Sequence, residues 1–328
     1  MEPAETKSQP PDEQVDLLSS LPSVRVQESY LLYQYQGFWY PPHFVQGIIN
    51  CQQQFQPREN DIFLVTAPKS GTTWFRALLF ALMNRKTHPP QSPHHPLLHK
   101  TPSGLLPLLE MVHPSEYDSA ACNSLDSNNT RIFSTHMPLA TLPKSITDNS
   151  STSSNCKIVY LCRGIKDNFV SFFHFINNNN YLHSPISLED AFELYCNGKF
   201  VIGPVWDQIL GYWKESLESP HKVLFMKYED MKIEPRIQLT RLARFLGNPF
   251  SPEEQNSGLI DQILSLCSFD NLSKLKVNNI QEPGVPVTSK SFFRNGVVGD
   301  AKNYLSADMV SRLDQITQEK FRDYNLSL

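Results

Sequence analysis

The sequence predicts a three-layer α/β/α domain with a central, mainly parallel sheet. Three short apolar segments, residues 62–65, 157–162 and 222–226, are each followed by a polar turn and a helical pattern. Runs this short and apolar are typical of strands covered on both faces, and repeated strand–helix units favour parallel pairing. With 328 residues, 40% of them hydrophobic, the chain has room for a substantial core. We expect a mobile tail over 1–20 and a single domain over 21–328.

Charge and targeting features exclude several classes of partner. The formal net charge of -4 provides no overall positive field for collecting nucleic acid. No run of about 18 uncharged apolar residues is present, so we expect no membrane span. The acidic N-terminus lacks a secretory signal, and the six cysteines form no C-x-x-C pair, which favours reduced thiols. These features predict a cytoplasmic protein with neither nucleic acid nor membrane as a partner.

Two segments precede the first strand. Residues 34–43 combine dense aromatic side chains with two prolines, which suits a loop that packs on the core or lines an apolar pocket. Residues 44–55 show partial helical periodicity and predict a helix that leads toward the strand.

Residues 61–83, D-I-F-L-V-T-A-P-K-S-G-T-T-W-F-R-A-L-L-F-A-L-M, predict a buried strand, an anion-binding loop and a helix. Pro68 and Gly71 mark the turn, and the apolar segment 74–83 continues as a helix that Thr72 or Thr73 can open. At such a junction, unpaired backbone N–H groups and the positive end of the helix dipole face outward together. The loop adds one cation and three hydroxyl groups, from Lys69, Ser70, Thr72 and Thr73. The segment therefore predicts a pocket for a phosphate or a sulfate.

This lysine loop differs from the ATP-binding pattern G-x-x-x-x-G-K-[ST], because its lysine precedes its only glycine. Taken alone, it also fits an ordinary lysine in a strand-to-helix turn. The order P-K-S-G-T-T-W resembles the nucleotide loop of sulfotransferases that use 3'-phosphoadenosine 5'-phosphosulfate (PAPS). The resemblance implies that Lys69 neutralises the bridging or 5'-phosphate oxygen. It also implies that the following residues cradle the phosphosulfate: Ser70, Gly71, Thr72 and Thr73.

Residues 87–107 are dense in prolines, and we expect them to lack regular structure and to form a surface loop beside the substrate entrance. Four histidines lie in this stretch. Prolines separate them and no acidic or cysteine partner stands at ligand spacing, so we expect no metal site.

The segment R-I-F-S-T-H-M-P, residues 131–138, reads as a strand that ends at a proline. Alternation places Ile132, Ser134 and His136 on one side. A histidine at a strand end is structural or catalytic, and the residues alone leave both open. The segment resembles the T-H-x-P motif that carries the catalytic base in the same family, which implies that His136 is a general base. Many members have a lysine two residues earlier, where this chain has Ser134.

The second strand, 157–162, is followed at once by Arg163, with Asp167 as the expected N-cap of a helix that includes 169–176. In α/β sheets, ligands bind beyond the carboxyl ends of the strands, which is where Arg163 would lie. The residue fits either a surface salt bridge or a second phosphate clamp. Ser171 falls in the first turns of the helix.

The remaining helical patterns cover residues 186–217, 235–246 and 259–266. Later, Phe293-Arg294-Asn295-Gly296 resembles the family's F-R-K-G loop, with asparagine in place of lysine. The resemblance implies that this loop folds over the 3'-phosphate of the nucleotide. The residues it assigns to the 3'-phosphate or its loop are Arg163, Ser171, Arg294, Asn295 and Gly296. Those it assigns to the adenine are Trp74, Phe269 and, on the same side, Tyr228.

Together these blocks identify the chain as similar to the PAPS-dependent sulfotransferases, most of all their plant soluble branch, from about Gly37 to Tyr304. The resemblance implies sulfuryl transfer, without a metal, to a small, largely apolar hydroxylated acceptor such as a flavonoid, steroid or hydroxylated hormone. Our candidates for the acceptor pocket are Phe38, Trp39, His113, Phe173 and His174. The dimer motif K-T-V-x-x-x-E of the animal enzymes is missing near 302–308, so we expect a monomer.

Two other functions remain open at this point. A nucleoside phosphate kinase with a divergent loop is disfavoured, because no apolar strand ends in an acidic residue that would hold magnesium beside the loop. A non-catalytic nucleotide-binding protein of the same fold is disfavoured because Lys69 and His136 are both present.

Overall fold

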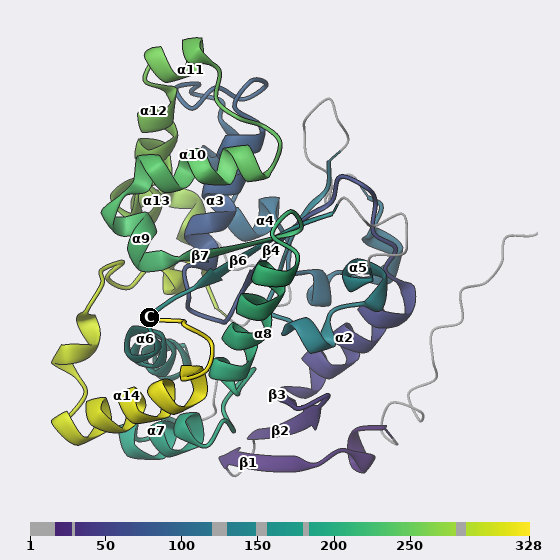
Figure 1. Ribbon diagram of the computed structural model, residues 1–328, viewed down its shortest axis with the longest axis vertical. Coiled ribbons are helices and arrows are strands. Elements are labelled where there is room, and N and C mark those ends of the chain that lie inside the picture. Colours follow the sequence, from purple (N-terminus) through teal and green to yellow (C-terminus); the bar gives the residue numbers. More distant parts are fainter. Residues whose placement is uncertain (1–16, 28–29, 120–129, 149–155, 180–183, 280–286) are drawn as a thin grey trace, which may run out of the picture.

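The computed structural model in Figure 1 describes residues 17–27, 30–119, 130–148, 156–179, 184–279 and 287–328. Of the tail expected over 1–20, residues 1–16 lie outside this set. Residues 17–20 are helical, and Leu18 packs against the core.

The central sheet consists of four parallel strands in the order β5-β4-β6-β7. Their bounds are Ile62–Thr66 (β4), Ile132–Thr135 (β5), Lys157–Cys162 (β6) and Val223–Lys227 (β7). Every residue of β4 and β5 is buried, as expected for strands that are covered on both faces. The predicted α/β fold with a central parallel sheet is confirmed.

Helices cover both faces of this sheet (Figure 1). Strand alternation divides the core, because Phe63 and Val65 face one layer while Ile62 and Leu64 face the other. The first layer contains α2 (Pro42–Gln54), α6 (Ile165–Asn178), α7 (Leu188–Cys196), α8 (Val205–Glu218) and α14 (Ala307–Phe321). The second contains α3 (Thr72–Met83), α9 (Tyr228–Ile233), α10 (Pro235–Phe245), α12 (Leu259–Leu266) and α13 (Phe269–Lys274). No described helix has the length and apolar character needed to cross a bilayer.

A second, antiparallel sheet replaces the loop predicted over 34–43. Its strands are β1 (Ser23–Gln27), β2 (Tyr30–Tyr35) and β3 (Phe38–Tyr40). Gln36 and Gly37 have φ values of 49° and 87°, which suit the two-residue turn of a hairpin. The loop prediction was wrong because most of these aromatic residues lie on β2 and β3, two paired strands that a tight turn joins.

Residues 87–107 are more regular than predicted. They contain a 3-10 turn, Pro96–Leu98, and the short helix α4, Pro102–Leu105. Each begins with proline at its first position, where the missing N–H costs no hydrogen bond, and His95 and Thr101 cap them. The prolines therefore prevent long helices in this stretch but allow short ones that begin with proline.

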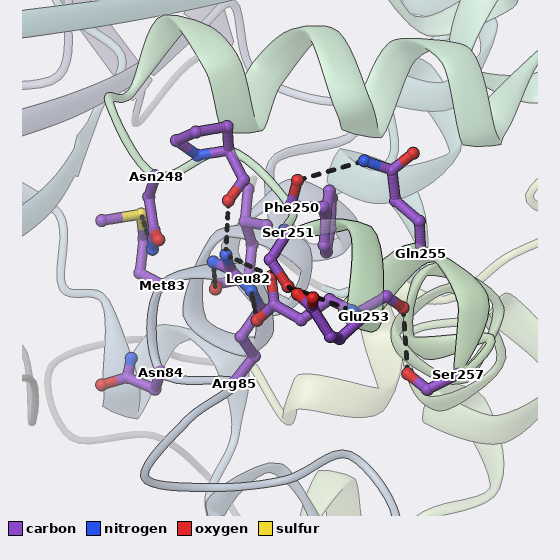
Figure 2. A network of polar contacts seen from close by, with 12 residues as sticks. Leu82, Met83, Asn84, Arg85, Asn248, Phe250, Ser251, Glu253, Gln255 and Ser257 are labelled. Atoms are coloured by element: carbon purple, nitrogen blue, oxygen red, sulfur yellow. Dashed lines mark hydrogen bonds and ion pairs between the residues drawn. The ribbon is translucent and has the colours of Figure 1, made fainter.

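The far end of α3 is tied to α11 (Pro252–Asn256) by a buried arginine (Figure 2). Arg85 Nε donates to Glu254 Oε1 at 2.8 Å and Nη2 donates to the Pro249 carbonyl at 3.0 Å. Glu254 also completes a capping box with Ser251. This network anchors the helix that carries the lysine loop at the end remote from the loop.

Candidate active site

The lysine loop connects β4 to α3 at the carboxyl edge of the sheet. Lys69 and Gly71 adopt the left-handed conformation, with φ values of 67° and 107°. A Cβ at position 71 would lie 2.9 Å from the Tyr228 ring, so this position requires glycine. Gly71 caps α3 without a side-chain hydrogen bond, which leaves the first backbone N–H groups of the helix available to an anion.

A cavity of about 590 Å³ opens beside this loop. The sequence-predicted site residues that line it are Lys69, Gly71, Thr72, Thr73, Trp74, His136, Arg163, Ser171, Tyr228, Phe269, Arg294, Asn295 and Gly296. Ser70 is the exception. Its side chain is buried, and its hydroxyl accepts a hydrogen bond from Asn168 Nδ2 at 3.1 Å. The Ser70 side chain therefore stabilises the loop from behind.

His136 follows β5 and lies beside the end of β4. Its Nδ1 is 2.8 Å from the Thr66 carbonyl oxygen. Because a carbonyl oxygen only accepts, Nδ1 carries the proton and Nε2 keeps a lone pair. Desolvation of the ring lowers the pKa of His136 to about 4, and the charges of Arg76 and Lys69 act in the same direction. The imidazole is thus neutral, with Nε2 unprotonated, at physiological pH.

Two backbone contacts fix the position of this histidine. The His136 N–H donates to Glu110 Oε1 at 2.8 Å, and Gln208 Nε2 donates to the His136 carbonyl at 2.9 Å. Burial raises the pKa of the Glu110 carboxyl. Sequence analysis did not single out Glu110 or Gln208, because neither lies in a motif or close to His136 in sequence.

Lys69 lies among aromatic rings and other cations. Its Nζ is 4.2 Å from the centroid of the Phe175 ring and 5.4 Å from that of Phe292. Desolvation lowers the pKa of Lys69 to about 7, and the nearby charges of Arg163 and Arg294 act in the same direction. These three positive side chains repel one another, and a bound anion would relieve that repulsion. The arrangement therefore suits an anion-binding site.

The two arginines are held by backbone and carboxylate groups. Arg163 donates to the carbonyls of Lys69, at 3.2 Å, and Val297, at 3.1 Å. Arg294 pairs with Asp300 at 2.6 Å. The buried Nε of each arginine has no hydrogen-bond partner among the described residues, which suits recognition of a further anionic group.

Asp167 is not the N-cap that the sequence predicted, because α6 starts at Ile165 after Gly164. Its carboxylate instead accepts hydrogen bonds from the backbone N–H groups of Gly299, at 2.6 Å, and Ala301, at 2.9 Å. Asp167 thereby joins α6 to the late loop, which contains Arg294. Arg163 and Arg294 both line the cavity.

Aromatic side chains also line the cavity. The rings of Trp74 and Tyr228 meet edge to face, with centroids 5.4 Å apart. The Tyr228 hydroxyl donates to the Gly296 carbonyl at 3.2 Å, and a side chain at position 296 would collide with the Phe269 ring. The late loop therefore packs directly on the aromatic residues that the resemblance assigned to the adenine.

The sequence profile of the family described as "Sulfotransferase domain" matches residues 59–325, which include the lysine loop, His136 and both arginines. The chain belongs to the sulfotransferase family. Cytosolic sulfotransferase 6 of Arabidopsis thaliana is 44% identical over 317 residues, covering 96% of this chain and 94% of the relative. Cytosolic sulfotransferase 5 of the same plant is 42% identical over 316 residues, covering 96% of each. The resemblance to the plant soluble branch is confirmed.

Solved sulfotransferase structures share the fold. A crystal structure of an Arabidopsis thaliana sulphotransferase superposes with a TM-score of 0.72 and 35% identity, covering 98% of this chain and 99% of that one. Mouse sulfotransferase SULT7A1 superposes with a TM-score of 0.69 and 26% identity, covering 90% of this chain and 96% of that one. It was crystallised with PAP, the desulfated nucleotide 3'-phosphoadenosine 5'-phosphate. With the anion-binding features above, the PAP bound in the mouse structure supports PAPS as the donor of this sulfotransferase.

The five residues predicted for the acceptor pocket of the sulfotransferase do not line the cavity. Phe38 and Trp39 are core residues of β3, and His113 caps a 3-10 turn. Phe173 and His174 lie on another face of α6 from Ser171 and the cavity-lining phenylalanines, because the sequence did not determine the rotation of that helix. The apolar and imidazole side chains that line the cavity instead include His43, Phe44, Met111, Phe172, Phe175, Val201, Ile202 and Phe292.

Residues 87–107 contribute to this cavity through Ser103 and Pro107, in keeping with their predicted place beside it. The histidines His88 and His95 pack against the Phe80 ring, at 6.3 Å and 5.9 Å between centroids. No group of three His, Cys, Asp or Glu side chains that could hold a metal occurs in the part of the chain that the structure describes.

Proposed function

We propose that this sulfotransferase transfers the sulfuryl group of PAPS to a hydroxyl of a small, largely apolar acceptor, with His136 as the general base. The observation that carries the proposal is the hydrogen bond from His136 Nδ1 to the Thr66 carbonyl, which leaves Nε2 as a proton acceptor in the cavity beside the lysine loop.

The donor supplies an activated sulfuryl group joined to the 5'-phosphate through a bridging oxygen. His136 Nε2 accepts the acceptor proton as the acceptor oxygen forms its bond to sulfur and the bridging S–O bond breaks. PAP then leaves with the bonding electron pair. Lys69 and the N–H groups of the first turn of α3 stabilise the charge on the 5'-phosphate and bridging oxygen. Holding both reactants in one cavity removes much of the entropic barrier.

The rest of the donor site fits the nucleotide. Arg163, Ser171 and Arg294 bind the 3'-phosphate, where the partnerless Nε atoms of the two arginines offer donors. Asn295 supports that loop through its hydrogen bond to Asp300, at 3.2 Å. Trp74 and Phe269 stack on the adenine, with Tyr228 beside them.

The apolar lining of the rest of the cavity supports the proposed acceptor class. Phenylalanine, valine, isoleucine and methionine side chains dominate there, which suits an apolar body carrying one reactive oxygen. Flavonoids, steroids and hydroxylated hormones all meet that description, and the Arabidopsis structure above is described as a candidate steroid sulphotransferase. We further propose a single domain over 21–328, a monomer and a cytoplasmic location, the last supported by the names of the relatives.

Incubation of the protein with radiolabelled PAPS and a panel of phenols, flavonoids, steroids and hydroxylated hormones tests the proposal. We expect label to pass to at least one small hydroxylated compound without added metal. Efficient labelling of polysaccharide or peptide tyrosine, with every small compound a poor acceptor, would contradict the acceptor class but not the donor site.

A further inference from the structure

A buried arginine that no sequence motif singled out lies at the reaction end of the cavity. Arg76 is in the second turn of α3, four residues after Thr72, and therefore on the same face of the helix. Its side chain lines the cavity together with His136, although the residue is only 5% exposed. A guanidinium remains protonated at any pH that a protein meets, so this group is a permanent positive charge.

Ser134 fixes the position of this charge. Arg76 Nε donates to Ser134 Oγ at 2.8 Å, and Ser134 Oγ in turn donates to the Pro107 carbonyl at 2.9 Å. Ser134 lies two residues before His136 at the end of β5, so alternation places both side chains on one side. The hydroxyl thus holds the guanidinium beside the imidazole.

The lysine loop, the helix terminus and the histidine converge on the same point. Thr72 Oγ1 is 2.6 Å from Thr66 Oγ1, which is 3.2 Å from His136 Nδ1. Thr72 belongs to the turn of α3 proposed to hold the phosphosulfate, and Arg76 follows it by one turn. Arg76 therefore lines the same cavity as the proposed base, one helical turn beyond the residues proposed to hold the phosphosulfate.

From this placement we infer that Arg76 is a further catalytic residue, whose guanidinium supplies positive charge to the sulfuryl oxygens during transfer and is positioned by Ser134. The inference rests on the proposed function. Arg76 exchanges no proton: the acceptor proton goes to His136 Nε2, the acceptor O–S bond forms, and the bridging S–O bond breaks toward the 5'-phosphate.

The inference also accounts for the departure at position 134. A lysine there would extend from β5 into the space next to the Arg76 side chain, whereas serine accepts the Arg76 hydrogen bond. A cation can therefore reach the same point from β5 or from α3. This chain has the second arrangement.

Steady-state kinetics on Arg76→Met, Arg76→Lys and the double variant Arg76→Met with Ser134→Lys test the inference. We expect Arg76→Met to lower kcat by about 10²-fold, the size of effect seen when one transition-state hydrogen-bond donor is removed. Affinity for PAP should change by less than about threefold, because PAP lacks the sulfuryl group. The kcat of Arg76→Lys should lie between those of the wild type and Arg76→Met. The double variant should have a kcat at least about tenfold above that of Arg76→Met, because the new lysine restores a positive charge.

Arg85→Met is the matched control, because it removes a buried guanidinium just beyond the far end of α3, outside the cavity (Figure 2). It should lower the melting temperature and leave the kcat of the folded protein unchanged. An unchanged kcat in Arg76→Met, or a loss of PAP affinity that matches the loss of kcat, would overturn the inference. If Arg76→Met does not fold, a kcat for the charge-preserving Arg76→Lys that lies well above that of Arg76→Gln would support it, and equal kcat values in these two variants would overturn it.

A second readout does not depend on turnover. The charge of Arg76 contributes to the low pKa of His136. In an NMR titration of histidine side chains, the His136 pKa should rise in Arg76→Met and stay unchanged in Arg85→Met. If the wild type sulfates no acceptor, the proposed function fails while this titration still tests the placement of Arg76, and an unchanged His136 pKa would contradict it.

Discussion

The low pKa of Lys69 predicts that nucleotide binding to the site takes up a proton. Desolvation and two neighbouring arginines bring this pKa to about 7 in the free protein. A bound anion would remove the repulsion that lowers it, so the complex contains protonated Lys69. Above pH 7 the binding-competent, protonated form becomes the minor form, and apparent affinity falls with the protonated fraction.

The size of the effect follows from that fraction. With a pKa of about 7, roughly half of Lys69 is protonated at pH 7 and about 1% at pH 9, so the Kd for PAP should rise about fifty-fold across this interval. The phosphates of PAP contribute little to this change, because their second ionisation, near pH 6, is almost complete by then.

Isothermal titration calorimetry of PAP binding between pH 7 and pH 9, in buffers of different ionisation enthalpy, measures both quantities. Roughly 0.5 to 1 proton should be taken up per PAP bound above pH 7, on the order of the neutral fraction of Lys69. The variant Lys69→Met should bind more weakly at pH 7 and lose the proton uptake. A Kd independent of pH over this range, or the same uptake in Lys69→Met, would refute the reasoning about Lys69.

Three further predictions concern other parts of the site. Arg294→Ala should lower the preference for PAP over its 3'-dephospho analogue by roughly 1.5–3 kcal/mol, measured by calorimetry with the surface variant Arg236→Ala as control, and an unchanged preference would remove Arg294 from the site. Gly71→Ala should weaken PAP binding at least about tenfold, because the new Cβ meets the Tyr228 ring and the left-handed φ becomes strained, whereas wild-type affinity would show that the loop adapts. Because the His136 pKa is about 4, kcat/KM for the acceptor at saturating PAPS should stay level as pH falls from 6.5 to 5, and a decline with a midpoint near 6.5 would indicate an unperturbed imidazole.

The sequence predicted the central sheet well because its strands are short, apolar and followed by helices of clear periodicity. Residues 157–162 match β6 in full, and the helix that Thr72 or Thr73 was expected to open starts at Thr72. The lysine loop was recognisable because its residues are contiguous and their order is constrained by the anion-binding backbone. The lysine loop, Arg163 and Tyr228 come soon after β4, β6 and β7, where local sequence indicates local geometry.

Contacts between distant segments could not be predicted in the same way. The acceptor cavity depends on how α6 is rotated and on how the β2–β3 hairpin packs, so Phe172 and Phe175 line it while the predicted Phe173 and His174 do not. Arg76 was overlooked for a similar reason. Its partner Ser134 is 58 residues away, and the only local signal was its spacing of four residues from Thr72.

The proposal that His136 is the general base is tested most directly by measuring single-turnover sulfuryl transfer and PAP affinity in His136→Ala, with the exposed His94→Ala as control. We expect the transfer rate to fall on the order of 10²-fold or more while the Kd for PAP stays within about threefold of wild type, because a base acts on the acceptor and not on the nucleotide. A near-wild-type rate, or a loss of PAP affinity as large as the loss of rate, would contradict the proposed role of His136.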